Sequence, residues 1–331
     1  MGKNSYLFEN VYLHNWSSVI GNKEYLGPLG HLVDKHYDDL YFNNQSYEKA
    51  ESSLIKDVIN LSLEKGNLKE DEIDLLIGGD LINQLVVSNY AVRDYNIPFI
   101  GVYAACSTTT LGFLVGAQFL ENNHDKTVIV FTSSHNGGAE RTFRYPNEYG
   151  NQRAISYTTT VTAANSFMLC NRKSKIKLTK VTIGKVVDST LKDPQDMGRA
   201  MAPAAYNTIM EHFNDFDFKT DEYDLILTGD LSYYGNKMLQ EMFKIDGIEF
   251  NMMNDSGLMI YDRKKQHVWA GGSGAGCIGV VLSSEVFPKM VAGLYKKVLI
   301  CATGALMNST MLAQKETIPG ICHAVAFEVV E

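Results

Sequence analysis

The chain has 331 residues, of which 45% are hydrophobic and 21% charged, a globular composition with enough material for two domains or one large fused unit. Its formal net charge of −8 argues against nonspecific binding to nucleic acid, which depends on clustered Lys and Arg. The five cysteines form no C-x-x-C pair and are odd in number, which argues against a zinc motif or a complete disulfide framework and favours a reducing cytosol.

The first predicted element is a helix over residues 46–63. Its apolar side chains recur with helical spacing, and Ser46 is placed to cap its first turn. The residues before it contain no hydrophobic signal core, and the chain start lacks the Ser or Thr of a myristoylation site. No targeting segment is therefore expected.

Short strands then recur in two similar halves of the chain. DLLIGGDL at 74–81 returns 150 residues later as DLILTGDL at 224–231, and KTVIVFTS at 126–133 has a counterpart in KKVLICAT at 296–303. Strands that alternate with helices indicate mixed sheets covered by helices. Duplication and fusion would explain the repeat and give two domains, residues 1–172 and 173–331. Chance similarity of two strand-turn sequences is the alternative.

Cys106 lies in the middle of residues 95–120, the longest stretch without a charged side chain. The apolar run before it predicts a buried strand, and the run after it predicts a buried helix that starts near Ser107. A thiol at the positive end of a helix dipole ionises more easily, and an anion can bind there without a lysine. A simply packed cysteine is the alternative.

The same stretch is long enough to span a bilayer. Four consecutive hydroxyl residues at its centre make a buried strand followed by a buried helix the better interpretation. No transmembrane segment is expected.

Duplicated α/β halves, with a cysteine opening the central helix of the first half, resemble the thiolase and β-ketoacyl synthase superfamily. That resemblance implies a five-layered αβαβα fold with two central helices buried between sheets. Within the superfamily, the chain is similar to the stage V sporulation protein AD family from about residue 6 to residue 329. The motifs that carry this similarity are GPLGH at 27–31, GDLINQ at 79–84, ACST at 105–108, TSSHN at 132–136, ERTFRYPNEYG at 140–150, QDMG at 195–198, MAPAA at 201–205 and AGGSG at 270–274.

The resemblance implies a component of the machinery that moves pyridine-2,6-dicarboxylic acid (dipicolinic acid), with calcium, into the developing spore and out of it at germination. In this family the component binds dipicolinic acid and is peripheral at the cytosolic face of the forespore and spore inner membrane. Its implied partners are the membrane-embedded stage V sporulation proteins of the same system, and no cofactor is implied. A homodimer is expected by analogy with the superfamily.

Condensing enzymes of the superfamily need a thiolate, histidine or asparagine partners and an oxyanion hole. Cys106 matches the nucleophile position, but Gly229 and the turn at 271–274 replace the second-half partners, and neither can act as a base. We therefore expect a binding protein with no catalytic residues. One alternative is an acyltransferase that uses Cys106 as nucleophile with His135 or His323 as base. Another is a structural adaptor that needs no small ligand.

A planar dianion needs convergent hydrogen-bond donors and at least one guanidinium. Residues 133–153 gather several such groups in an otherwise acidic chain, and a solvated or dimer-facing loop is the alternative. Asp80 and Asp230 end equivalent strands, which suggests a structural role such as capping the turns that follow, with ligand contact as the alternative, and no metal site is predicted. The predicted ligand-binding residues are Cys106, Ser107, Ser134, His135, Arg141, Arg144 and His323.

Overall fold

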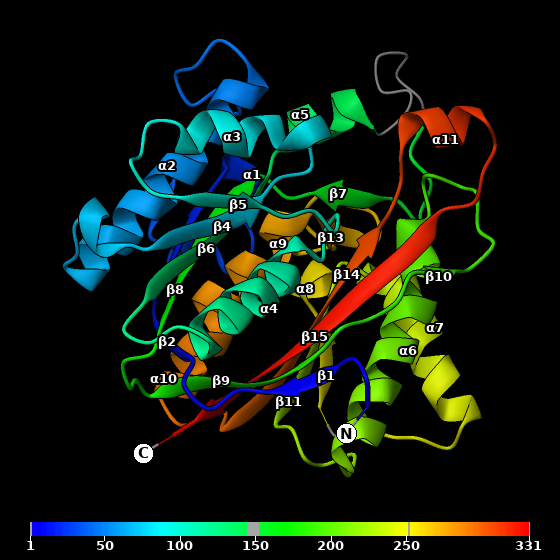
Figure 1. Ribbon diagram of the computed structural model, residues 1–331. Helices are drawn as coiled ribbons and strands as arrows, with labels where there is room; N and C mark the ends of the chain where they lie inside the picture. The colour runs from blue at the N-terminus through cyan, green and yellow to red at the C-terminus, as the bar shows by residue number, and fades with distance from the viewer. Residues whose placement is uncertain (1, 144–151, 251, 331) are drawn as a thin grey trace.

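The computed structural model describes residues 2–143, 152–250 and 252–330 (Figure 1). The strands of these residues are β1 (Ser5–Leu7), β2 (Tyr12–Ile20), β3 (Lys35–His36), β4 (Leu75–Gly79), β5 (Phe99–Gly101), β6 (Thr127–Ser134), β7 (Thr158–Thr160), β8 (Ala163–Cys170), β9 (Ile176–Thr182), β10 (Val187–Asp188), β11 (Leu225–Gly229), β12 (Met253–Asp255), β13 (Gly271–Ser273), β14 (Lys297–Ala305) and β15 (Pro319–Val329). The helices are α1 (Asn22–Tyr25), α2 (Tyr47–Gly66), α3 (Val86–Val92), α4 (Thr108–Glu121), α5 (Asn136–Thr142), α6 (Met197–Phe216), α7 (Ser232–Ile245), α8 (Ser256–Met259), α9 (Ala275–Val281), α10 (Phe287–Val291) and α11 (Ser309–Ala313).

The main sheet has the strand order β12-β11-β14-β15-β9-β2-β8-β6-β4-β5, and its two halves share one topology. In the first half β4 runs parallel to β5 and β6, while β8 runs antiparallel to β6 and β2. In the second half β11 runs parallel to β12 and β14, while β15 runs antiparallel to β14 and β9. The halves join through a short pairing of β2 with β9, where Leu13 is opposite Ile176. The predicted boundary between residues 172 and 173 stays a prediction.

Helices occupy three layers around these strands. Helix α4 packs against β4 and β6 of the first half and against β14 and β15 of the second, and α9 packs beside it on β6 and β8. The outer face of the first half is covered by α2 and α3, and that of the second half by α6 and α7 (Figure 1). The predicted five-layered αβαβα architecture is confirmed.

The local sequence explains the main elements. Strands β4, β6 and β11 are buried along their whole length, as expected for strands covered by helices on both faces. Helix α2 begins as predicted, because Ser46 is its N-cap and accepts a hydrogen bond from the Lys49 N–H at 3.3 Å. Helix α4 has 14 residues, and among the described helices none is long and apolar enough to cross a membrane.

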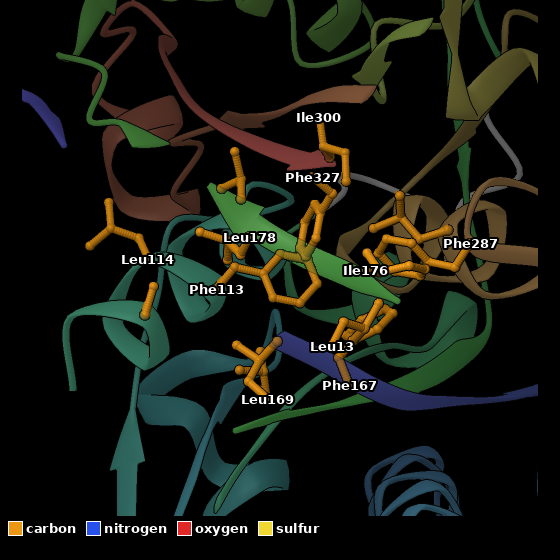
Figure 2. Packing of buried hydrophobic residues seen from close by; sticks show 14 of the residues in the cluster. Leu13, Phe113, Leu114, Phe167, Leu169, Ile176, Leu178, Phe287, Ile300 and Phe327 are labelled. Atoms are coloured by element: carbon orange, nitrogen blue, oxygen red, sulfur yellow. The ribbon is translucent and has the colours of Figure 1, made fainter. Parts of the chain in front are cut away.

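The central core lies around α4 and joins the two halves (Figure 2). Phe113 of α4 is fully buried, and its ring centroid lies 4.9 Å from that of Phe167 on β8 and 5.2 Å from that of Phe327 on β15. Phe287 packs against the same two rings. One aromatic cluster therefore holds residues from both halves of the chain.

Candidate functional site

Cys106 lies on a tight turn that leads into α4. Ala105 just before it has a left-handed backbone, with φ of 49°, although it is not glycine. The Thr108 hydroxyl holds this turn, because it donates to the Ala105 carbonyl at 2.6 Å and accepts from the Ala104 N–H at 3.1 Å. The predicted place of Cys106, next to the start of a buried helix, is confirmed.

The second half of the chain packs directly against this turn. A Cβ on Gly304 of β14 would lie 2.3 Å from the Ala104 carbonyl oxygen, so only glycine permits this approach. The Ser107 hydroxyl donates to the Ala302 carbonyl of β14 at 2.7 Å. Ser107 thus connects the halves rather than capping α4 with its side chain.

A narrow cavity reaches Cys106. The room inside it for a water-sized molecule is about 20 Å³, the space free of atoms with the open mouth included is about 330 Å³, and Cys106 itself is 7% exposed. The lining is mostly apolar, and among the described lining residues none carries a charge. The lining residues are Leu81, Tyr103, Ala105, Cys106, Phe143, Thr160, Met197, Ser273, Gly274, Ala305 and Met307.

Thr160 is one of the lining residues, and its buried hydroxyl is unsatisfied. Its side chain is 1% exposed, and its Oγ1 has no hydrogen-bond partner within the described protein. A buried hydroxyl without a partner costs free energy, so such groups in native structures call for an explanation. A polar ligand at the cavity would supply the missing partner.

Opposite α4, the strand pair β7–β13 shapes the cavity wall. Ser273 pairs with Thr160 in this small parallel sheet, and Gly274 follows with φ of 112°. A Cβ on Gly274 would lie 2.6 Å from Ser134 Oγ. Glycine is required at position 274 both by its backbone angle and by this contact.

Two buried carboxyl groups lie near Cys106: Asp230 contacts the thiol, and Asp255 lies close to Asp230. Asp230 is hydrogen-bonded to the Cys106 thiol and accepts a bond from the Gly274 N–H at 2.8 Å. Burial, together with the nearby Asp255, raises the pKa of Asp230 to about 8. Burial also raises the pKa of Asp255, to about 7.

The role predicted for Asp230 as cap of the following turn is wrong. Asp255 holds that turn instead, because it accepts bonds from the N–H groups of Leu231 at 3.1 Å and Ser232 at 2.8 Å. Asp80 in the first half does cap its turn, accepting from the Ile82 N–H at 2.8 Å. The equivalent strand ends therefore differ, and Asp230 is left beside the cysteine.

The raised pKa of Asp230 predicts a pH-dependent stability. Between about pH 4, its unfolded pKa, and about pH 8, the folded chain holds a proton that the unfolded chain releases. The free energy of unfolding should therefore fall as pH rises through this window, by up to about 1.4 kcal/mol per unit. In Asp230→Asn, urea unfolding measured across this window should show a flatter profile than in the wild type. Asp71→Asn, at an exposed position, is the control, and equal slopes in Asp230→Asn and wild type would contradict the assignment.

His135 lies away from the cavity. Its Nε2 is 2.8 Å from the Leu40 carbonyl oxygen, and its Nδ1 accepts from the Gly138 N–H at 3.3 Å, so both ring nitrogens are engaged. The ring also stacks on Tyr47. Burial lowers the pKa of His135 to about 4, which keeps it neutral. The structure gives it the geometry of a helix cap on α5.

Two further predicted residues, Ser134 and His323, are buried and form hydrogen bonds with the backbone. Ser134 Oγ donates to the Val161 carbonyl at 2.7 Å and accepts from the Gly276 N–H at 3.1 Å. His323 Nδ1 accepts from the Gly184 N–H at 3.2 Å, and burial lowers its pKa to about 4. Neither residue belongs to the described cavity lining.

The two arginines of the predicted ligand segment that the structure describes, Arg141 and Arg153, are not among the cavity lining residues. Arg141 is half-exposed and forms an ion pair with Glu48 of α2. Arg153 pairs with Glu140 at 2.6 Å and stacks over the Tyr157 ring. Arg144 lies outside the described residues. Of the seven predicted ligand-binding residues, Cys106 is the one that the described structure places on the cavity wall.

Comparison with known proteins identifies the family. The pattern of stage V sporulation protein AD (SpoVAD) matches residues 2–328. Stage V sporulation protein AD of Bacillus subtilis strain 168 is 44% identical over 329 residues, which cover 99% of this chain and 97% of that protein.

The chain belongs to the stage V sporulation protein AD family.

Solved structures show the fold of this SpoVAD family member. Cerulenin-bound OleA of Xanthomonas campestris matches with a TM-score of 0.63 and 14% identity, over 97% of this chain and 98% of that one. The 3-oxoacyl-[acyl-carrier-protein] synthase III of Aquifex aeolicus matches with a TM-score of 0.59 and 12% identity, over 96% and 99%. The expected thiolase-like fold is confirmed.

Gly229, at the position predicted to replace a catalytic histidine, is closely packed in this chain. A Cβ would lie 3.1 Å from the Ile278 side chain and 3.2 Å from Ala302 Cα, so a larger residue would need these neighbours to shift by a few tenths of an ångström. The carboxyl of Asp230 follows directly and lies beside Cys106 instead. The neighbour of the cysteine at this end of β11 is thus a buried carboxyl group rather than an imidazole.

Proposed function

We propose that this chain is the dipicolinate-binding component of the spore dipicolinate and calcium transport machinery, acting in uptake during sporulation and in release at germination. Its family supports a role in sporulation. The observation that carries the ligand is the cavity at Cys106 with the unpartnered Thr160 hydroxyl on its wall. The positive end of the α4 dipole lies at the same place and favours a carboxylate.

The lining supports a flat ligand whose charge is partly neutralised. Leu81, Phe143 and Met197 offer apolar contact to an aromatic ring, and the described lining contains no cationic side chain. Burying a free dianion in such a cavity would be costly. Calcium or a proton entering with dipicolinate would remove that cost.

We infer that binding proceeds without catalysis. Condensing enzymes of this superfamily use a histidine with their cysteine, whereas position 229 is glycine here and the described neighbour of the Cys106 thiol is the Asp230 carboxyl. The alternative, an acyltransferase with Cys106 as nucleophile, is supported by the fold shared with condensing enzymes. Incubation with acyl-CoA and intact-mass measurement separates the two, because an acyl adduct on Cys106 would contradict a purely binding role.

The proposed setting is peripheral, at the cytosolic face of the forespore and spore inner membrane, with the membrane-embedded stage V sporulation proteins as partners. A homodimer is proposed as well. The edge strand β5 supports it, because β5 pairs on one side with β4 and its Ile100 is exposed. Light scattering of the purified protein tests the dimer.

Calorimetric titration with dipicolinate tests the ligand directly. Saturable heat is expected with dipicolinate and its calcium complex, whereas pyridine, which lacks both carboxylates, should give none. Folded protein that shows no heat at millimolar dipicolinate, with or without calcium, would refute the proposal and leave the structural adaptor as the better interpretation.

A further inference from the structure

A basic and aromatic face adjoins the wall of the Cys106 cavity. It is built on residues 262–269, which connect α8 to β13, and β13 runs from there directly to Ser273 and Gly274 of the cavity lining. A shallow hollow is lined by residues 263–269. We call this surface the basic face. It comprises Lys23, Tyr25, Leu26, Tyr233, Arg263, Lys264, Lys265, His267 and Trp269.

Arg263 and Trp269 form the fixed centre of the basic face. Arg263 Nε donates to the Trp269 carbonyl at 3.0 Å, and its guanidinium lies 4.3 Å from the Tyr233 ring centroid. Trp269 has a left-handed backbone, with φ of 51°, and its side chain stays 38% exposed although Tyr157 packs edge-on against it. A strained non-glycine residue that keeps an indole at the surface is unusual and is typical of a functional position.

Helix α1 extends the basic face. Lys23 Nζ donates to the His267 carbonyl at 2.9 Å, and Gln266 Nε2 donates to the Lys23 carbonyl at 2.8 Å. These bonds tie α1 to residues 266–267, and the exposed Tyr25 at the end of α1 and Leu26 just after it follow Lys23 on the same short segment, with Leu26 68% exposed. Cationic and apolar groups are therefore mixed on one surface.

The charge of the basic face is opposite to that of the chain. Lys23, Arg263, Lys264 and Lys265 gather there in a protein whose net charge is −8. Asp262 pairs with Lys265 at 3.3 Å. Lys23 is half-buried, burial lowers its pKa, and the carboxyls of Glu24 and Glu140 act on it, so the exposed positive charge comes from Arg263, Lys264 and Lys265.

We infer that the basic face docks on an anionic phospholipid bilayer. Exposed Lys and Arg are attracted to anionic headgroups, while Trp, Tyr and Leu side chains enter the boundary between headgroups and acyl chains. The Lys265 side chain is 84% exposed, which suits a fluid layer of headgroups better than the fixed carboxylates of an acidic protein. This inference deepens the peripheral location proposed above and rests on it for the presence of a bilayer. Docking here would place the Cys106 cavity beside the membrane.

Flotation of the full chain with lipid vesicles tests this inference. Wild type should bind vesicles that contain phosphatidylglycerol, bind pure phosphatidylcholine weakly, and lose binding as salt rises. Lys264→Glu with Lys265→Glu should weaken binding at least about tenfold, since each cation near an anionic surface contributes substantially. Trp269→Ala should weaken binding while the salt dependence remains.

A matched control is Lys173→Glu with Lys219→Glu, which changes net charge equally at exposed positions beyond the far ends of β8 and α6. It should bind vesicles like wild type. Equal vesicle binding by the Lys264/Lys265 variant and the control would overturn the inference. Binding of wild type to an acidic protein without any binding to vesicles would overturn it as well. The heat of dipicolinate binding should be unchanged in the Lys264/Lys265 variant. Calorimetry and flotation therefore test the ligand proposal and the docking surface independently.

Discussion

Replacing Cys106 with tryptophan should lower dipicolinate affinity at least about a hundredfold, or about 2.7 kcal/mol, because the indole would fill the narrow cavity at its inner end. Calorimetry measures the affinity, and circular dichroism verifies that the variant is folded. Cys106→Ser keeps the volume and a donor, so it should bind within about tenfold of wild type. Undiminished binding by folded Cys106→Trp would place the ligand elsewhere.

Thr160→Val provides a second variant for the same site, with almost no change of volume. The hydroxyl has no partner within the described protein, so its removal should leave the free energy of unfolding unchanged or raise it. Ligand affinity should fall about tenfold or more, since the hydroxyl is proposed to bond to a carboxylate. A loss of stability with full affinity would contradict this role for Thr160.

Phe113→Ala should reduce the free energy of unfolding by about 3 to 5 kcal/mol, the usual cost of deleting a fully buried aromatic side chain. Its ring contacts Phe167 of the first half and Phe327 of the second, so the cavity left behind is bordered by rigid strands on both sides (Figure 2). Urea unfolding followed by circular dichroism measures the change. Tyr90→Ala, at an exposed aromatic position, should cost far less. Equal costs would show that the central cluster does not bear on stability.

The layered fold was predictable because its signals are local. The start of α2 at Ser46 follows from capping and periodicity, and the repeated strands β4 and β11 follow from short apolar runs ending in Gly-Asp. Cys106 was found for the same reason, since a strand, a turn and a helix follow one another along the chain. All of these predictions rest on interactions between residues that are close in the sequence.

The rest of the site depends on contacts that no local pattern encodes. Thr160 lies in a run of β-branched residues typical of any strand, and only its pairing with Ser273 brings it to the cavity. Asp255 is a single acid that ends the short strand β12, and its bonds to Leu231 and Ser232 reach across 24 and 23 residues. His135 was predicted at the cavity because it follows an apolar strand in a Ser-Ser-His-Asn turn, but its ring lies against the Leu40 carbonyl and is not part of the described lining.

The short β2–β9 pairing bears on how the molecule unfolds. Because α4 contacts strands of both halves, neither half alone can shield its own central helix from water. Isolating one half would expose the rings around Phe113, a large loss of hydrophobic stabilisation. The duplicated halves should therefore melt together, as one cooperative unit, in spite of their separate topologies.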